Sequence, residues 1–149
     1  GRFKFGWDAE NRRGIVTCRY IHLLLPGKDR AWELARYKQA MELQWHYYGP
    51  FGFAAVLTVE GETFDPRQMV EADRLFEKGV ALFGTPEEVA EAILRIKTAC
   101  GYEDFMFHAW FEKGGFAGEE IEEQMRYFAA EVMPILRREC GGSPRDHHR

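Results

Sequence analysis

Aromatic and histidine side chains gather near the end of one apolar segment, DFMFHAWF at residues 104–111. In a strand, His108 and Trp110 would share one face and Phe111 would lie on the other, because alternate residues point the same way. Such rings either wall a ligand pocket or pack between strand and helix, and for a single aromatic residue packing is the commoner role. His108 adds a group that can donate a hydrogen bond to a ligand.

A second apolar segment, GIVTCRYIHLLL at residues 14–25, carries Arg19 and His22. An arginine within an apolar strand needs a carboxylate or phosphate partner, and a structural ion pair is the default interpretation. A histidine late in such a strand serves as a satisfied core group or as a ligand contact. We therefore take Arg19, His22, His108 and Trp110 as candidate cofactor-binding residues and assign no catalytic residue.

Other residues carry weaker signals. Lys113 lies in the turn EKGGFAG and could attract an anion, but we expect it to be solvated, and the turn lacks the spacing of a phosphate-binding loop. Cys100 lies at a helix end, where the negative end of the helix dipole disfavours a thiolate nucleophile. His147 and His148 have no third ligand nearby in the sequence, so no metal site is predicted.

The composition is that of a single globular domain with a core, since 46% of the 149 residues are hydrophobic and 30% are charged. The formal net charge of -4, with basic and acidic residues interleaved, disfavours a nucleic-acid partner. Three cysteines without CxxC spacing favour reduced thiols and a cytoplasmic protein. The sequence has no apolar run of membrane-spanning length, so we expect no membrane partner.

Caps and turn residues predict alternating strands and helices. Thr85 and Glu88 form a capping box around a proline at the first helical position, and Gly101 supplies a left-handed stop. Pro134 removes a backbone donor within the last helix, so we expect a kink or altered geometry there. The expected elements are an irregular lead-in at 1–13, strands at 14–25 and 104–111, helices at 29–48, 67–78, 85–100 and 119–139, a hairpin formed by 53–59 and 62–64, and a flexible tail at 141–149.

This order predicts an α/β fold with parallel strands joined by helical crossovers. Both strands are apolar on both faces, which is typical of strands buried within a larger parallel sheet. Two strands cannot bury themselves, so neighbouring strands must come from elsewhere. We expect them from a second copy or from another part of a longer chain.

Residues 81–136 resemble the C-terminal segment of the luciferase-like flavin-dependent monooxygenases. Three features match in order: the helix start GTPEEV at 84–89, the aromatic strand leading to the Gly114-Gly115 turn, and a closing helix that contains FAAEVMP at 128–134. Residues 15–48 look like the strand and helix that precede this segment in the family. The connection at 49–66 falls where the family has a variable, mobile loop.

The resemblance implies a partial (β/α)₈ TIM barrel, made of the last two βα units with an inserted loop or hairpin and an extra helix, in a domain at 1–140. It implies an oxidoreductase that uses reduced FMN, or the deazaflavin F420, and O₂ to oxidise a small organic substrate, with reduced flavin supplied by a flavin reductase. Trp110 or Phe111 would wall the pocket and His108 would hydrogen-bond the cofactor. The loop at 49–66 would close over the site.

Two hypotheses follow for the function. In the first, the chain is the C-terminal segment of a flavin-dependent monooxygenase whose remaining strands lie on a missing stretch of the same polypeptide, because a complete barrel takes about 250 residues. In the second, it is a non-catalytic half-barrel module that forms a homo-oligomer or binds a protein partner through exposed strand edges.

Overall fold

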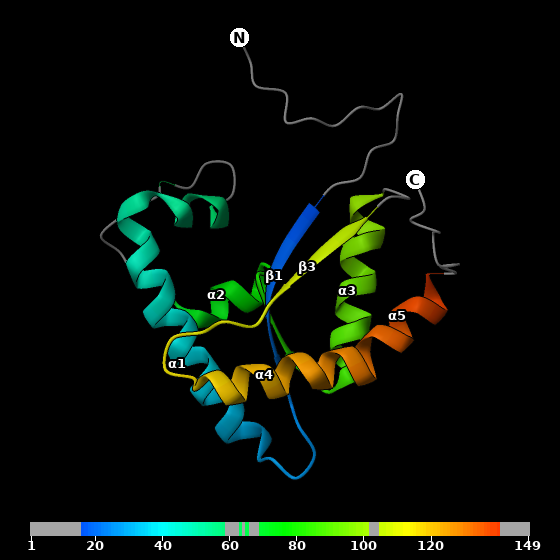
Figure 1. Cartoon of the computed structure of the whole chain (residues 1–149). Helices are drawn as coiled ribbons and strands as arrows, with labels where there is room; N and C mark the ends of the chain where they lie inside the picture. Colours follow the sequence, from blue (N-terminus) through cyan, green and yellow to red (C-terminus); the bar gives the residue numbers. More distant parts are fainter. Residues whose placement is uncertain (1–15, 59–62, 64, 66–68, 102–104, 141–149) are drawn as a thin grey trace, which may run out of the picture.

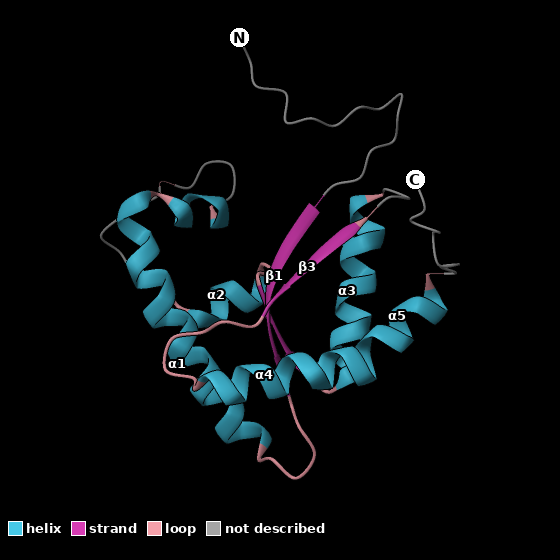
Figure 2. Ribbon diagram, in the orientation of Figure 1, coloured by secondary structure: helices cyan, strands magenta, loops and turns pink. Residues whose placement is uncertain are grey.

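The computed structural model describes residues 16–58, 63, 65, 69–101 and 105–140 of the chain (Figure 1). The expected lead-in, the tail and most of the second hairpin arm lie outside the described residues. Within those ranges the chain folds as an α/β unit, in which a small sheet is flanked by helices (Figure 2).

The sheet has three parallel strands, β1 (Val16–Leu23), β2 (Ala81–Gly84) and β3 (Met106–Trp110), in the order β2-β1-β3. The expected parallel pairing of the first and last strands is therefore confirmed. Their expected bounds, 14–25 and 104–111, extend past the strands at residues 24, 25 and 111, while residues 14, 15 and 104 lie outside the described residues. β2 was not predicted as a strand, because its four residues are too few to show a periodic pattern.

Eight helical segments are described, and most agree with the expected order. Residues 53–57 of the expected hairpin arm at 53–59 are helical instead, because Gly52 adopts φ 78° and starts a new 3₁₀ turn, and residue 59 lies outside the described residues. The segments are α1 (Arg30–Tyr48), η1 (Gly49–Phe51), η2 (Phe53–Leu57), α2 (Ala72–Glu77), α3 (Pro86–Cys100), α4 (Gly118–Tyr127), η3 (Phe128–Val132) and α5 (Met133–Glu139).

The expected caps are present. Asp29 accepts a hydrogen bond from the backbone of Trp32 and begins α1, and Thr85 with Glu88 forms the capping box of α3. Gly101 ends α3 at φ 70°. These local signals were strong enough to fix helix ends from the sequence.

The last helix changes geometry where proline predicted that it would. η3 is a π-helical turn of five residues between α4 and α5, directly before Pro134. Proline has no N–H for the carbonyl of Ala130, so the chain widens here into a different hydrogen-bonding pattern. The prediction of altered geometry is confirmed.

Helices cover both faces of the sheet (Figure 1). Tyr20 packs with α1, α2 and η2 in one apolar cluster, whereas Ile21 and Leu23 pack with α3 and η3 in another. The two sets are alternate residues of β1, so the pleat directs them to opposite faces. β1 is consequently the buried centre of the fold.

β3 lies at one end of the strand order and is less buried than the sequence suggested. Met106 is 63% exposed and His108 is also exposed, so the expectation that this strand is buried on both faces is wrong for the described residues. On β1, Val16 pairs with Met106 and is 58% exposed. The helices of the described chain therefore leave part of the apolar surface of β3 uncovered.

Gly84 joins β2 to the capping box, and its replacement tests that junction. We expect Gly84→Ala to destabilise the fold by about 2 kcal/mol or more, because the backbone has φ 152° and an added Cβ would lie 2.9 Å from Glu88 Cβ and against its carboxylate. The measurement is urea unfolding. Gly118→Ala is the matched control, since nothing lies within 4 Å of its added Cβ, and it should change stability by less than about 1 kcal/mol. Equal effects of the two substitutions would contradict the tight junction.

Candidate functional site

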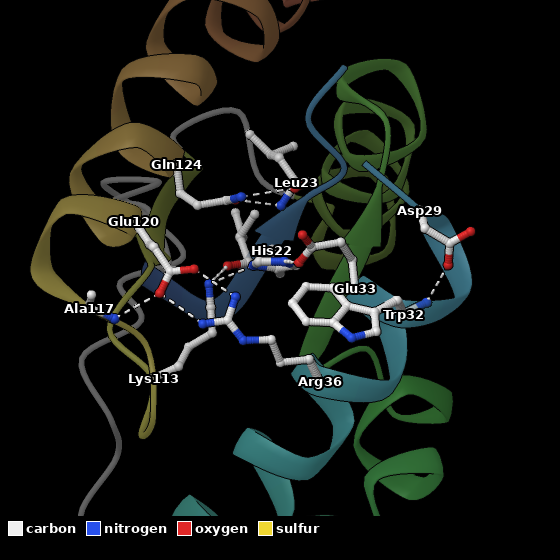
Figure 3. A network of polar contacts seen from close by, with 11 residues as sticks. His22, Leu23, Asp29, Trp32, Glu33, Arg36, Lys113, Ala117, Glu120 and Gln124 are labelled. Carbon is white, nitrogen blue, oxygen red and sulfur yellow. Dashed lines mark hydrogen bonds and ion pairs between the residues drawn. The ribbon is translucent and has the colours of Figure 1, made fainter. Parts of the chain in front are cut away.

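The carboxyl end of β1 holds a buried polar network to which three other parts of the chain contribute (Figure 3). His22 comes from β1, Glu33 from the first turn of α1, Lys113 from the segment after β3, and Glu120 and Gln124 from α4. The ends of parallel strands, where the chain turns into helices, are the usual place for sites in α/β folds. The network is therefore the candidate functional site.

His22 bridges Lys113 and Glu33. Its Nε2 lies 2.9 Å from Glu33 Oε2, and its Nδ1 lies 3.1 Å from Lys113 Nζ, which also donates to the carbonyl of Ile21 at 2.9 Å. Glu33 accepts from Nε2–H, because a carboxylate in the first turn of a helix is favoured by the positive end of the helix dipole. Nδ1 is then the acceptor for the amine. His22 is 2% exposed, Lys113 3% and Glu33 5%, so the whole chain of bonds is closed off from water.

Burial favours the neutral forms of both basic groups. It lowers the pKa of His22 from 6.5 to about 4, helped by the neighbouring Lys113 and opposed by the bond to Glu33. It lowers the pKa of Lys113 from 10.5 to about 7, helped by the charge of Arg36. At neutral pH the site holds an uncharged imidazole and an amine that is close to losing its proton.

An ion pair closes the network toward α4. Arg36 donates two hydrogen bonds to Glu120, at 2.6 and 2.7 Å, and Glu120 also accepts from the backbone of Ala117. These bonds, with that from Arg36 foremost, lower the pKa of Glu120 to about 2. The guanidinium lies 4.0 Å from the Phe116 ring centre and the Lys113 amine 5.0 Å from it, so one ring lies against both basic groups.

Gln124 fixes the end of β1 itself. The backbone N–H of Leu23 donates to Gln124 Oε1 at 2.6 Å, and Gln124 Nε2 donates to the Leu23 carbonyl at 2.9 Å. Both groups are buried, and leaving such backbone atoms without partners would cost about 1–3 kcal/mol each. The side chain acts here as a substitute for a neighbouring strand.

A pocket of about 330 Å³ lies beside Lys113. Its wall comes from the second half of α1, the end of β3 and the residues that follow β3. The lining residues are Leu43, Gln44, Tyr47, Tyr48, Trp110, Glu112, Lys113 and Gly114. Gln44 Oε1 is buried and has no hydrogen-bond partner within the described part of the chain. The pocket thus has apolar and aromatic walls, and Gln44, which carries this unpaired acceptor, is one of its lining residues.

The four residues proposed from the sequence have different surroundings. His22 lies in the network and Trp110 lines the pocket, where its ring is 5.5 Å from that of Tyr20. His108 stacks on Trp110 but is exposed and pairs with Cys18, four residues before His22 on β1. Arg19 donates to the carbonyl of Cys18, and none of the described carboxylates contacts it.

Lys113 corrects an expectation, because it is buried and not a solvated loop residue. Its sequence neighbours are charged and Gly-rich, which signals a loop, and only the fold brings it against His22. Glu33, Arg36, Glu120 and Gln124 were not identified from the sequence. Their spacing is that of ordinary helix surfaces, so the sequence carries no signal that separates them from other charged or polar helical residues.

Comparisons with known proteins give no relative: no family model, no curated protein and no solved structure matches the chain. Among the described residues, none of the helices is both long and apolar enough to cross a membrane. The same part of the chain contains no cluster of three or more histidine, cysteine or acidic side chains suited to hold a metal ion. The site is therefore interpreted from its own chemistry, as a buried amine and imidazole beside an aromatic pocket.

The buried amine predicts a pH dependence of stability. Between about pH 7 and 10 the unfolded chain keeps a proton on Lys113 that the folded chain has lost, so stability should rise with pH by up to about 1.4 kcal/mol per unit. Urea unfolding across this range should show the slope in the parent protein and in Lys38→Met, whose lysine is paired with Asp73 at the surface. Lys113→Met should lose it. A slope that persists in Lys113→Met would contradict a neutral buried amine.

Proposed function

We propose that the chain is the C-terminal part of a luciferase-like flavin-dependent monooxygenase, and that the face of the sheet carrying His22 and Trp110 borders the flavin and substrate pocket. The observation that carries this proposal is the parallel pairing of β1 with β3. Their register pairs Tyr20 with Trp110, so the carboxyl ends of both strands lie at one edge and their aromatic and histidine side chains share one face. The resemblance of residues 81–136 supplies the chemistry.

In the proposed barrel, the face with Tyr20, His22 and Trp110 is the inner one. α3, η3 and α5 pack on the opposite face and would form part of the outer ring of helices. In the described chain α1 packs on this same face, through Tyr37, Met41 and Trp45. The exposed side chain of Met106 would then be covered by a further strand beside β3.

The pocket lining fits the ring system of a flavin. Gln44 Oε1 is a buried acceptor without a partner, and an isoalloxazine ring carries an N–H that would satisfy it. Trp110 and Tyr48 offer flat surfaces for the ring. Reduced FMN, when bound, supplies the activation of O₂, while these residues orient the ring and exclude water. F420 is the alternative cofactor, and a small organic compound and a flavin reductase are the proposed substrate and partner.

A chimera tests the proposal. Residues 14–140 would replace the C-terminal segment of a luciferase-like enzyme, and FMN binding would be followed by quenching of its fluorescence. We expect saturable binding, weakened about threefold to tenfold by Trp110→Ala because one ring contact is lost. Trp32→Ala is the matched control, since this tryptophan is 57% exposed on α1 and does not line the pocket; it should leave the affinity unchanged.

Two results would contradict the proposal. One is a folded chimera, verified by circular dichroism, that binds no flavin. The other comes from the 149-residue chain alone: tight one-to-one FMN binding by a monomer would show that it needs no further strands. A stable dimer that neither binds flavin nor consumes oxygen with it would instead favour the non-catalytic module, for which the exposed Met106 and Val16 on neighbouring strands provide the specific observation.

A further inference from the structure

We propose that Cys18, Met106 and His108 form a binding site for a soft metal ion, Cu(I). The site rests on the register of β1 and β3, on the exposure of the three side chains and on the preference of this ion for sulfur and imidazole ligands. It lies toward the start of β3, whereas the pocket proposed for the flavin lies at the end of that strand. It does not depend on the flavin chemistry.

The pairing of β1 with β3 brings the three side chains together. Cys18 pairs with His108, and Met106 lies two residues before His108 on β3. Neighbouring strands lie about 4.8 Å apart, and residues i and i+2 of one strand lie about 6–7 Å apart. The long, flexible side chain of Met106 can therefore bring its sulfur to an ion held between Cys18 and His108.

All three side chains project from the same side of the sheet. Alternate residues of a strand share a face. The ring of Trp110 contacts those of Tyr20 and His108, which places the even-numbered residues of both strands on one side. Cys18 and His108 are exposed, and Met106 is 63% exposed. An ion can therefore reach these ligands from solvent without a change in the fold.

The ligands are not committed to other partners within the described ranges. Cys18 is a free thiol, and neither ring nitrogen of His108 has a hydrogen-bond partner there. The imidazole instead stacks on the Trp110 ring, with 5.9 Å between ring centres and 16° between planes. Trp110 is held in turn by Tyr20, whose ring centre is 5.5 Å away. One ligand is thus oriented before the ion binds, and such support raises metal affinity.

The donor set selects the ion. Thiolate and thioether ligands favour a soft ion, and imidazole is a good ligand for copper. Mg²⁺ and Ca²⁺ prefer oxygen ligands, which this set lacks. A structural Zn²⁺ site is filled by cysteine, histidine and carboxylate ligands, and the described residues hold no cluster of three of them. On binding, the thiol of Cys18 releases its proton to water and the thiolate donates a lone pair to Cu(I), so no oxidant or reductant is consumed.

A competition titration tests the site on the full chain. The 149-residue protein, kept reduced and anaerobic, would be added to the coloured Cu(I) complex of bicinchoninate, and the loss of colour would measure transfer of the ion. We expect one Cu(I) per chain to be transferred. Cys18→Ser should abolish the transfer, because the thiolate is lost. Cys100→Ser and Cys140→Ser, which remove the other two free cysteines, should leave it unchanged.

Further variants test the other two ligands. Met106→Leu keeps the size of the side chain but removes its sulfur, so we expect Cu(I) affinity to fall about tenfold or more. Met125→Leu is its matched control, since Met125 is 52% exposed on α4. His108→Gln should weaken binding similarly, whereas His46→Gln on the exposed side of α1 should not. The methyl resonance of Met106 should shift when Cu(I) is added, and circular dichroism would verify that each variant is folded.

Three results would overturn the proposal. The first is a folded parent chain that takes no Cu(I) from bicinchoninate. The second is binding that survives Cys18→Ser and is lost in Cys140→Ser, which would place the ion away from the sheet. The third is unchanged affinity in Met106→Leu together with an unshifted Met106 methyl resonance in the parent chain, which would exclude the thioether as a ligand.

Discussion

The hydrogen-bonded chain from Lys113 through His22 to Glu33 is the interaction on which the described structure most depends. It joins the segment after β3, the end of β1 and the start of α1 in a region closed to water. Buried polar groups contribute favourably only when each is paired, and a partly satisfied network is destabilising. Burial lowers the pKa of both His22 and Lys113, so these two basic side chains lie side by side without a buried carboxylate for each.

Lys113 and Gln124 supply hydrogen-bond partners to the backbone of β1 beyond the point where its pairing with β3 ends. Gln124 bonds both backbone groups of Leu23, and the Arg36–Glu120 pair holds α4 against α1. Toward the other end of the strands, Val16 and Met106 are exposed and the sheet has no comparable closure among the described residues. The fold is therefore most complete where the strands end, which is also where the pocket lies.

Much of the fold could be predicted from the sequence, because helix ends are fixed locally. Asp29, Thr85, Glu88 and Gly101 act through bonds to their own helix, and Pro134 alters its own turn, so their effects were foreseen. Parallel pairing followed from the alternation of strands and helices. Short β2 and the 3₁₀ turns after α1 were not foreseen, because each is decided by a few residues.

The candidate site could be predicted only in part. His22 and Trp110 were identified because a histidine or tryptophan near the end of an apolar strand is a candidate for contact with a ligand. Lys113 was expected to be solvated. Its burial depends on contact with His22 of β1, which is 91 residues away in the sequence. Glu33 and Gln124 resemble any polar residue of a helix surface until the helices are placed.

The protonation of His22 is the most direct test, because the hydrogen bonds that join Lys113, His22 and Glu33 require a neutral imidazole with its proton on Nε2. The measurement is the ¹⁵N chemical shifts of its two ring nitrogens at neutral pH, assigned by comparison with His22→Gln. We expect a protonated Nε2 facing Glu33 and an unprotonated Nδ1 that accepts from Lys113. An imidazolium, or a neutral ring with its proton on Nδ1, would contradict it.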